Sequence, residues 1–322
     1  MLVIIKNDWY RTWNNKGRLV MMFLLMIAAM VIALYMGNHA KERINIGVVG
    51  EQNQALQASE IVQITYLTQL PPTSELVKGT YDAIIQKKDT GFEVKTIKND
   101  DYRKKVAQLL AHPSQKETIS GKKRGTGSLI IGFLLMFILM TSLTNSFTFN
   151  EDKEKRMIER VLTTPINLLK LLLAHSLFSF LLLFIPTLLI VYSAKLIFQL
   201  SIGFNLLEYF LLLGLICLFA TAVSLFFAAL FDDSDRSNMM GSVVVVISTI
   251  LSGSFFSFAN GNRWLNTLIQ LLPQKRYLDI VTYLEQGELV SKMLPNILYV
   301  FVFTLLFFLF ALLKTQKDYI RS

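Results

Sequence analysis

The chain has 322 residues, of which 53% are hydrophobic and only 17% are charged. Charged residues make up about a quarter of a typical soluble domain, so this composition excludes an ordinary soluble protein. The formal net charge of +9 does not indicate a nucleic-acid-binding protein, because the 32 Lys and Arg residues lie mostly outside the apolar runs and form no separate basic domain. Basic flanks of this kind orient membrane spans and contact anionic lipid head groups.

Several apolar runs are long enough to cross a bilayer, which takes about 20 residues of helix. A helix is expected in each run because it satisfies its own backbone groups in lipid. The single cysteine, Cys217, lies inside one of the runs and can form no intrachain disulfide. We therefore predict an all-α polytopic membrane protein with six transmembrane helices. The predicted spans are residues 19–37, 128–148, 171–197, 206–231, 239–259 and 294–313.

Residues 1–18 mix basic and aromatic side chains, a composition typical of the head-group level of a bilayer. We expect a cytoplasmic interfacial helix there, followed by residues 19–37 as a retained first span rather than a cleaved signal peptide. An even number of spans returns the C-terminus to the same side. Lys314, Lys317 and Arg321 follow the last span, as a cytoplasmic C-terminus requires.

Residues 38–127 differ in composition from the rest of the chain and look soluble. Four short runs rich in β-forming residues predict strands, and a capped apolar pattern at 100–112 predicts a helix. The topology places this segment outside the cell, so we expect a small extracellular α+β domain between the first two spans. The strand-like runs are residues 44–50, 61–67, 81–86 and 92–97.

The loop after the second span is charged and has a helical pattern. Asn150 or Asp152 can cap a helix, which Pro165 then stops. The pattern predicts a short amphipathic helix on the cytoplasmic surface at 150–165. Its polar face would hold Glu154, Arg156, Glu159 and Arg160, and its apolar side Met157, Ile158, Val161 and Leu162.

Residues 261–284 follow the fifth span and carry an apolar stripe that begins at Trp264 and is interrupted at Pro273. The segment is too short and too broken for another pair of crossing helices. We expect an amphipathic re-entrant or interfacial segment on the outer side of the membrane.

The sequence lacks the motifs of several kinds of enzyme and transporter. There is no HExxH zinc motif, and Gly121–Ser128 (GKKRGTGS) lacks the order of a Walker phosphate-binding loop. None of the six runs has Asp, Glu or Arg near its centre, where an ion-coupled carrier normally needs them. We expect no enzymatic activity and no bound cofactor or metal in this chain. If ATP drives the protein, ATP and Mg²⁺ bind to another subunit.

The charged loop and the span order resemble the permeases of type-2 ABC transporters, the ABC-2-type exporter family. Those proteins typically show an acidic cluster, a Gly-Thr pair, a hydrophobic helix and Ser/Thr-Pro before the third span. Arg156-Met157 stands where Gly-Thr is usual, and the aromatic after Pro273 is Tyr277, about one residue later than common. The positions that fall on the pattern are Glu154, Glu159, Leu162, Thr164 and Pro165.

The resemblance implies a half-transporter whose loop docks on an ATPase subunit, present in two copies, beside a second permease that is identical or homologous. It also implies a re-entrant segment marked by Trp264, Pro273 and Tyr277. The residues expected to couple the chain to the ATPase are Glu154, Arg156, Glu159, Arg160, Thr164 and Pro165.

The Leu- and Phe-rich spans favour an amphiphilic or hydrophobic cargo, such as an antimicrobial, a drug, a peptide or a lipid-like molecule. With the resemblance, this favours drug or antimicrobial efflux and antibiotic resistance in a bacterial plasma membrane. Two alternatives stay open from the residues alone. One is a non-transporting sensor or scaffold with a ligand-binding extracellular domain, and the other is an ion-coupled secondary transporter.

Overall fold

The structure is a computed structural model. It describes residues 2–14, 16–39, 44–49, 62–67, 71, 81, 83–88, 91–96, 125–162, 167–197, 202–255 and 263–320. The chain divides into two compact units. The helical unit comprises Met1–Gly37, Arg124–Phe258 and Trp264–Ser322, and the strand unit comprises Asn38–Lys123 and Ala259–Arg263.

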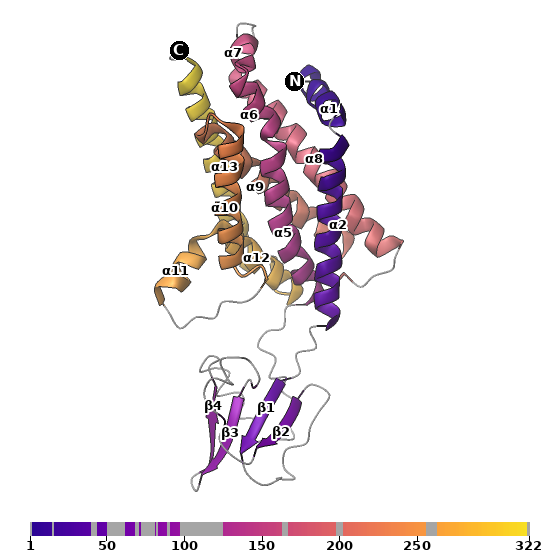
Figure 1. Ribbon diagram of the computed structural model, residues 1–322, viewed down its shortest axis with the longest axis vertical. Helices are drawn as coiled ribbons and strands as arrows, with labels where there is room; N and C mark the ends of the chain where they lie inside the picture. Colours follow the sequence, from indigo (N-terminus) through magenta and orange to yellow (C-terminus); the bar gives the residue numbers. More distant parts are fainter. Residues whose placement is uncertain are drawn as a thin grey trace. The chain divides into compact units, whose positions relative to one another are not determined.

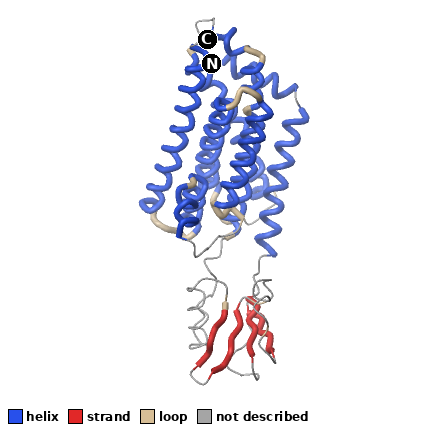
Figure 2. Tube along the Cα trace, turned by 60° about the vertical axis from the view of Figure 1, so that its left-hand side comes forward, coloured by secondary structure: helices blue, strands red, loops and turns tan. Residues whose placement is uncertain are grey.

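The helical unit is a bundle of helices of very different lengths (Figure 1). Its elements are α1 (Leu2–Asn14), α2 (Lys16–His39), α5 (Thr126–Asn145), α6 (Phe147–Glu154), α7 (Met157–Leu162), α8 (Leu168–Leu196), α9 (Leu206–Leu230), α10 (Ser234–Leu251), α11 (Arg263–Leu271), α12 (Pro273–Glu285) and α13 (Val290–Ile320). The helices α1, α6, α7 and the C-terminal part of α13 lie at one end, called the terminal end below (Figures 1 and 2). The helices α11 and α12 lie at the opposite, distal end.

Helix α9 is the centre of the bundle, and it contacts α5, α8, α10 and α13. It is apolar around its whole circumference, and most of its side chains are buried, although Leu207 and Leu211 remain exposed. Tyr209, Leu213 and Cys217 on α9 are completely buried. By contrast, α2 and α13 leave many apolar side chains exposed at the outside of the bundle, as helices that face lipid do.

Four helices in the described residues are long and apolar enough to cross a membrane: Thr126–Glu154, Leu168–Leu196, Leu206–Leu230 and Val290–Tyr319. A fifth is counted if Ile4–Asn14 and Leu19–Tyr35, bent by 80°, form one broken span. The expected total of six spans is therefore not reached by length and composition. The span that is missing from this count is the one expected at 239–259.

Helix α10 occupies that run with shifted ends, beginning at Ser234 and ending at Leu251. Its first turns contain Asp235, Arg236 and Asn238, which lower its apolar content. Beyond its end, Gly253 has a φ of +84°, a left-handed conformation that stops a helix and that glycine adopts without strain. The helix is therefore shorter and more polar at one end than the predicted span.

The strand unit contains one four-stranded sheet in the order β2-β1-β3-β4 among its described residues. Its strands are β1 (Ile44–Val49), β2 (Val62–Leu67), β3 (Ala83–Lys88) and β4 (Gly91–Lys95). Each overlaps a run predicted from the sequence, with β3 shifted by two residues. Strand β1 pairs in parallel with β2 and β3, and β3 pairs antiparallel with β4 in a hairpin. The helix predicted at 100–112 lies outside the described residues.

Candidate functional site

The segment predicted as one amphipathic helix at 150–165 is divided in the structure. Helix α6 is the end of a 29-residue helical stretch, Thr126–Glu154, that starts with α5. The chain then turns at Lys155 and Arg156, and α7 begins at Met157. Arg156 has a φ of +52°, in the left-handed region that ends helices and favours glycine. The division therefore comes from the backbone conformation of Arg156, which stands where the family pattern has glycine.

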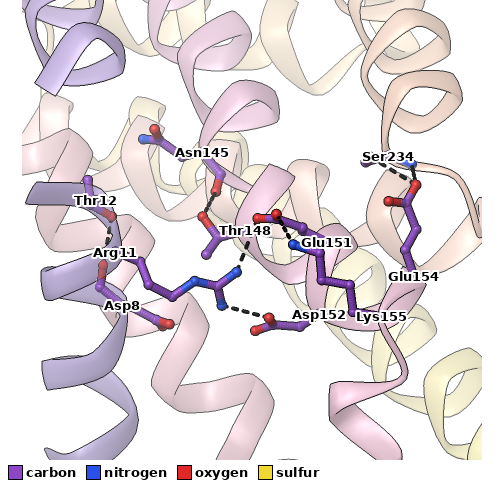
Figure 3. Close-up of polar contacts among 10 residues, drawn as sticks. All are labelled: Asp8, Arg11, Thr12, Asn145, Thr148, Glu151, Asp152, Glu154, Lys155 and Ser234. Carbon is purple, nitrogen blue, oxygen red and sulfur yellow. Dashed lines mark hydrogen bonds and ion pairs between the residues drawn. The ribbon is translucent and has the colours of Figure 1, made fainter. Parts of the chain in front are cut away.

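Glu154, the last residue of α6, binds another part of the same chain. Its Oε1 accepts hydrogen bonds from the backbone nitrogen of Ser234 at 2.7 Å and from the Ser234 hydroxyl at 3.0 Å (Figure 3). Ser234 is the first residue of α10, so the Glu154 carboxylate binds an otherwise unpaired N–H at the positive end of that helix. Asp233 adds a local cap by accepting from the backbone nitrogen of Arg236 at 2.7 Å.

Lys153, the neighbour of Glu154, binds the end of the preceding helix. Its Nζ donates to the carbonyl oxygens of Ala229 at 3.3 Å and Phe231 at 3.1 Å. These carbonyls belong to the C-terminal end of α9, whose dipole is negative. The same Nζ lies 2.8 Å from Asp232 Oδ1, and this contact lowers the pKa of Asp232 through the hydrogen bond and charge of the lysine.

Lys153 and Glu154 thus bind both sides of the turn between α9 and α10. We call Lys153, Glu154 and residues 229–234 together the turn clamp. The lysine meets the negative end of α9 and the glutamate meets the positive end of α10, so each charge matches its helix dipole. The Lys153 side chain is only 7% exposed, whereas that of Asp232 is 92% exposed. The buried contacts with the helix ends therefore contribute more than the exposed ion pair.

The opposite side of α6 holds the N-terminal helix. Arg11 on α1 contacts Asp152 with Nη1 at 2.6 Å and Glu151 with Nη2 at 3.1 Å (Figure 3). Glu151 also pairs with Lys155 one turn later. One guanidinium that binds two carboxylates fixes both the position and the orientation of α1 against α6.

Helix α7 presents charged side chains outward at the terminal end. Met157, Glu159 and Arg160 are exposed, while Ile158 is 2% exposed and packs into a small apolar cluster with Phe149 and Ala311. One buried anchor on a six-residue helix keeps the exposed face in a defined place. Arg156 is also exposed. The last two predicted coupling residues, Thr164 and Pro165, lie outside the described residues.

A groove of about 410 Å³ lies beside α7 at the same end. It runs between α1 and α6, and its walls are mostly polar. It is lined by Asn7, Arg11, Asn14, Thr148, Glu151, Lys155 and Met157.

The predicted outer residues lie at the distal end of the helical unit. Trp264 on α11 is 82% exposed, and Pro273 is the first residue of α12. Tyr277 is buried in the bundle, where its hydroxyl donates to the carbonyl oxygen of Leu212 at 3.0 Å. The three residues therefore do not form one site.

Another residue of α12, Glu285, caps a long helix in the same manner as Glu154. Its carboxylate accepts from the backbone nitrogens of Gly125 at 2.9 Å and Ser128 at 3.2 Å, and from the Ser128 hydroxyl. These groups lie at the N-terminal end of α5. The helical stretch Thr126–Glu154 is thus tied to α12 at the distal end and to the α9–α10 turn at the terminal end.

Sequence reasoning missed Lys153, Arg11 and Glu285 as parts of polar networks. Their partners are distant in the chain, and the local pattern around each residue contains no signal for them. Among the described residues, no three His, Cys, Asp or Glu side chains are grouped so that they could hold a metal ion. The polar contacts described at the terminal end are helix caps and ion pairs.

A family model described as ABC-2 family transporter protein matches residues 16–313. No curated protein sequence matches the chain. The family match covers the apolar helices, the strand unit, the turn clamp and α7, so it concerns the whole architecture and not one motif. The chain belongs to the ABC-2 transporter family and is a multi-pass membrane permease component of an ABC exporter.

Proposed function

We propose that this permease receives mechanical work from an ATPase subunit that docks at the terminal end, on α7 and the adjacent groove. The observation that carries the proposal is the difference in bonding between Glu154 and the charged residues of α7. All three charges are exposed, but the Glu154 carboxylate is bonded to Ser234 of the same chain, whereas Glu159 and Arg160 lie on the short anchored helix α7. Exposed opposite charges beside a polar groove offer specific contacts to a protein surface.

The turn clamp supplies the path for the motion. A displacement of α7 moves the end of α6, where Lys153 and Glu154 are bonded to α9 and α10. Because α9 contacts most of the long helices, a shift of the α9–α10 turn repacks the bundle. In this proposal Glu154 transmits the motion and does not touch the ATPase. Arg156, Glu159 and Arg160 make the docking contacts, with Thr164 and Pro165 leading into α8.

In the same proposal the terminal end and both chain termini are cytoplasmic, and the strand unit is extracellular. Helix α10 acts as a short sixth span beside α2, the α5–α6 stretch, α8, α9 and α13. Two permeases and two ATPase subunits form the working exporter in a bacterial plasma membrane. ATP and Mg²⁺ bind to the ATPase subunits and not to this chain. The family match favours this transporter over the sensor and the ion-coupled carrier.

The docking proposal is tested by charge reversal on α7. The chain is co-expressed with a candidate ABC ATPase subunit, and Glu159→Arg with Arg160→Glu is compared with Lys292→Glu. Lys292 is an exposed charge on α13 at the distal end, so its reversal is a control for a charge change away from the proposed docking site. We expect the α7 variant to lose co-purification and cargo-stimulated ATP hydrolysis at unchanged thermal stability. Retention of both by the α7 variant overturns the docking site.

For the cargo we propose an amphiphilic or hydrophobic molecule, as in antimicrobial or drug efflux. The support is the composition of the bundle, whose long helices are apolar throughout. The complex in proteoliposomes is given a panel of cationic amphiphiles, peptides, lipids and hydrophilic sugars. Stimulation of ATP hydrolysis by amphiphiles but not by sugars is the expected result. Stimulation by sugars alone contradicts the cargo class and leaves the docking proposal standing.

A further inference from the structure

A second polar cluster lies beneath α1, separate from the turn clamp. Asp8 on α1 is 1% exposed, and His175 on α8 is also buried. The histidine Nδ1 lies 2.8 Å from Asp8 Oδ2, which is the distance of an ion pair. Thr12, one turn after Asp8, is buried on the same face of α1. The opposite face carries Trp9, Tyr10 and Trp13, all exposed.

The Asp8 carboxylate faces a small cavity of about 10 Å³, which is room for a single water molecule. Within the described parts of the chain, neither oxygen of this carboxylate has a partner with hydrogen-bond geometry. Several uncharged polar side chains line the cavity together with Phe149, Phe178 and Leu225, and the polar ones supply partners for a buried water. Its polar lining residues besides Asp8 are Asn145, Ser146, Thr148, His175, Ser179 and Ser224.

The charges around Asp8 leave one group to balance it. A buried carboxylate is costly unless an opposite charge or several hydrogen bonds compensate it. Arg11 on α1 is close enough for its charge to attract Asp8, but its guanidinium is bonded to Asp152 and Glu151. The described residues of α5, α6 and α9 that line the cavity are uncharged, so His175 on α8 is the remaining compensating group. It can balance Asp8 only while it carries a proton.

We propose that Asp8 and His175 form a proton-binding site that holds α1 on α8, with one water molecule in the adjacent cavity. With one proton shared in the pair, the site is electrically neutral and α1 stays seated. When the proton leaves, a net negative charge is buried, and water entry with release of α1 relieves it. Arg11 lies on the same helix and forms part of the groove at the terminal end, so seating of α1 also sets the shape of that groove.

The test uses the full-length chain in lipid nanodiscs and needs no ATPase. Cys217 is the single cysteine of the sequence and is fully buried, so an introduced cysteine is the only reactive thiol of the folded chain. Thr12→Cys reports release of α1, because position 12 is covered when α1 is seated. Tyr10→Cys on the exposed face corrects for the pH dependence of thiol chemistry. The ratio of the two labelling rates is measured between about pH 5 and 8, where histidine changes its charge.

We expect the ratio to rise at least about threefold with pH in the otherwise unchanged chain, since one lost proton shifts the equilibrium by up to tenfold per pH unit. In an Asp8→Asn background the buried charge is gone, so the ratio stays low at every pH. In a His175→Gln background the carboxylate lacks its counter-charge at every pH, so the ratio stays high. These opposite results distinguish a charge-compensating pair from simple packing.

A ratio that does not change with pH in the unchanged chain overturns the proposal, as does an identical pH response in the Asp8→Asn background. If either background fails to fold, hydrogen exchange on the unchanged chain decides. Protection of the α1 amides, corrected for intrinsic exchange, must fall relative to α9 as pH rises. Constant relative protection rejects the proton site.

Discussion

Glu154 and Ser234 lie 80 positions apart in the chain, yet one Glu154 oxygen accepts both the backbone N–H and the hydroxyl of Ser234. This contact gives α10 a second cap, from a distant part of the chain, in addition to the local cap by Asp233. It also makes the end of α6 part of the turn between α9 and α10. The stability of the bundle should therefore depend on a residue that looks like a solvated surface charge in the sequence.

Replacement of Glu154 by alanine should lower the free energy of unfolding by about 1 kcal/mol, the usual loss for a removed helix cap. Glu159→Ala is the matched control, because Glu159 is an exposed acid on the next short helix. Heating in the presence of a thiol-reactive dye measures both variants, since the buried Cys217 reacts only on unfolding. Equal unfolding temperatures for the two variants would contradict the role of Glu154 in capping α10.

The lysine of the turn clamp should matter more than its exposed partner. Lys153→Met keeps the buried stem but removes the donor to Ala229 and Phe231, so we expect a loss of about 2 kcal/mol. Asp232→Asn removes only the ion pair with a 92% exposed carboxylate and should change little. The thermal assay with the Cys217 thiol compares them. A larger effect of Asp232→Asn would mean that the ion pair dominates the clamp.

The ion pair between Lys153 and Asp232 should make the stability of the fold depend on pH. Lys153 lowers the pKa of Asp232 in the folded chain, so the unfolded chain binds a proton more readily. The contribution is therefore present above the ordinary aspartate pKa of about 4 and is lost as pH falls through the lowered folded value. A small acid-side loss of stability in the unchanged chain should be missing in Asp232→Asn. The same acid slope in both chains would assign it to other carboxylates.

Arg156 should be a site where glycine stabilises the protein. Its φ of +52° is costly for a residue with a Cβ and is easy for glycine. Arg156→Gly should raise the free energy of unfolding by about 0.5 to 1 kcal/mol after the larger entropy of the unfolded glycine chain is counted. Lys155→Gly is the control, because Lys155 has a φ of −80° and no strain to relieve. Destabilisation by Arg156→Gly would show that the arginine side chain outweighs its backbone strain.

The distal cap can be tested by a double-mutant cycle. A Cβ at position 125 would lie 2.2 Å from Glu285 Oε1, so Gly125→Ala must displace the carboxylate from the N-terminal end of α5. Glu285→Ala removes the same cap, and each change alone should cost about 1 kcal/mol. The double variant should lose little more than either single variant, because both changes remove one interaction. Additive losses in the thermal assay would show that the two changes act separately.

The sequence predicted the apolar helices well where the run and the helix have the same ends. Helix α9 spans Leu206–Leu230 against a predicted 206–231, because polar residues close the run on both sides. The second span was predicted at 128–148, but its helical stretch continues to Glu154. An apolar run in the sequence indicates only the part of a helix that can lie in lipid. The charged extension is helical because Arg11, residues 229–231 and Ser234 bind its side chains.

The candidate site was predictable only in outline. Pattern and family resemblance identified the charged segment after the second span, but they treated Glu154 and Glu159 alike. What separates the two acids is the presence of Ser234 beside one of them, which depends on how α6 packs against α10. The buried pair of Asp8 and His175 escaped for the same reason. Local periodicity carries no information on such tertiary partners.

The helical stretch Thr126–Glu154 has 29 residues, which at the rise of an α-helix gives a length of about 43 Å. The hydrocarbon core of a bilayer is about 30 Å thick, so a rod of this length reaches well beyond it. Glu285 anchors one end and the turn clamp anchors the other. If the proposed coupling holds, a helix that extends past the lipid lets an ATPase in the water phase displace the membrane helices without entering the bilayer.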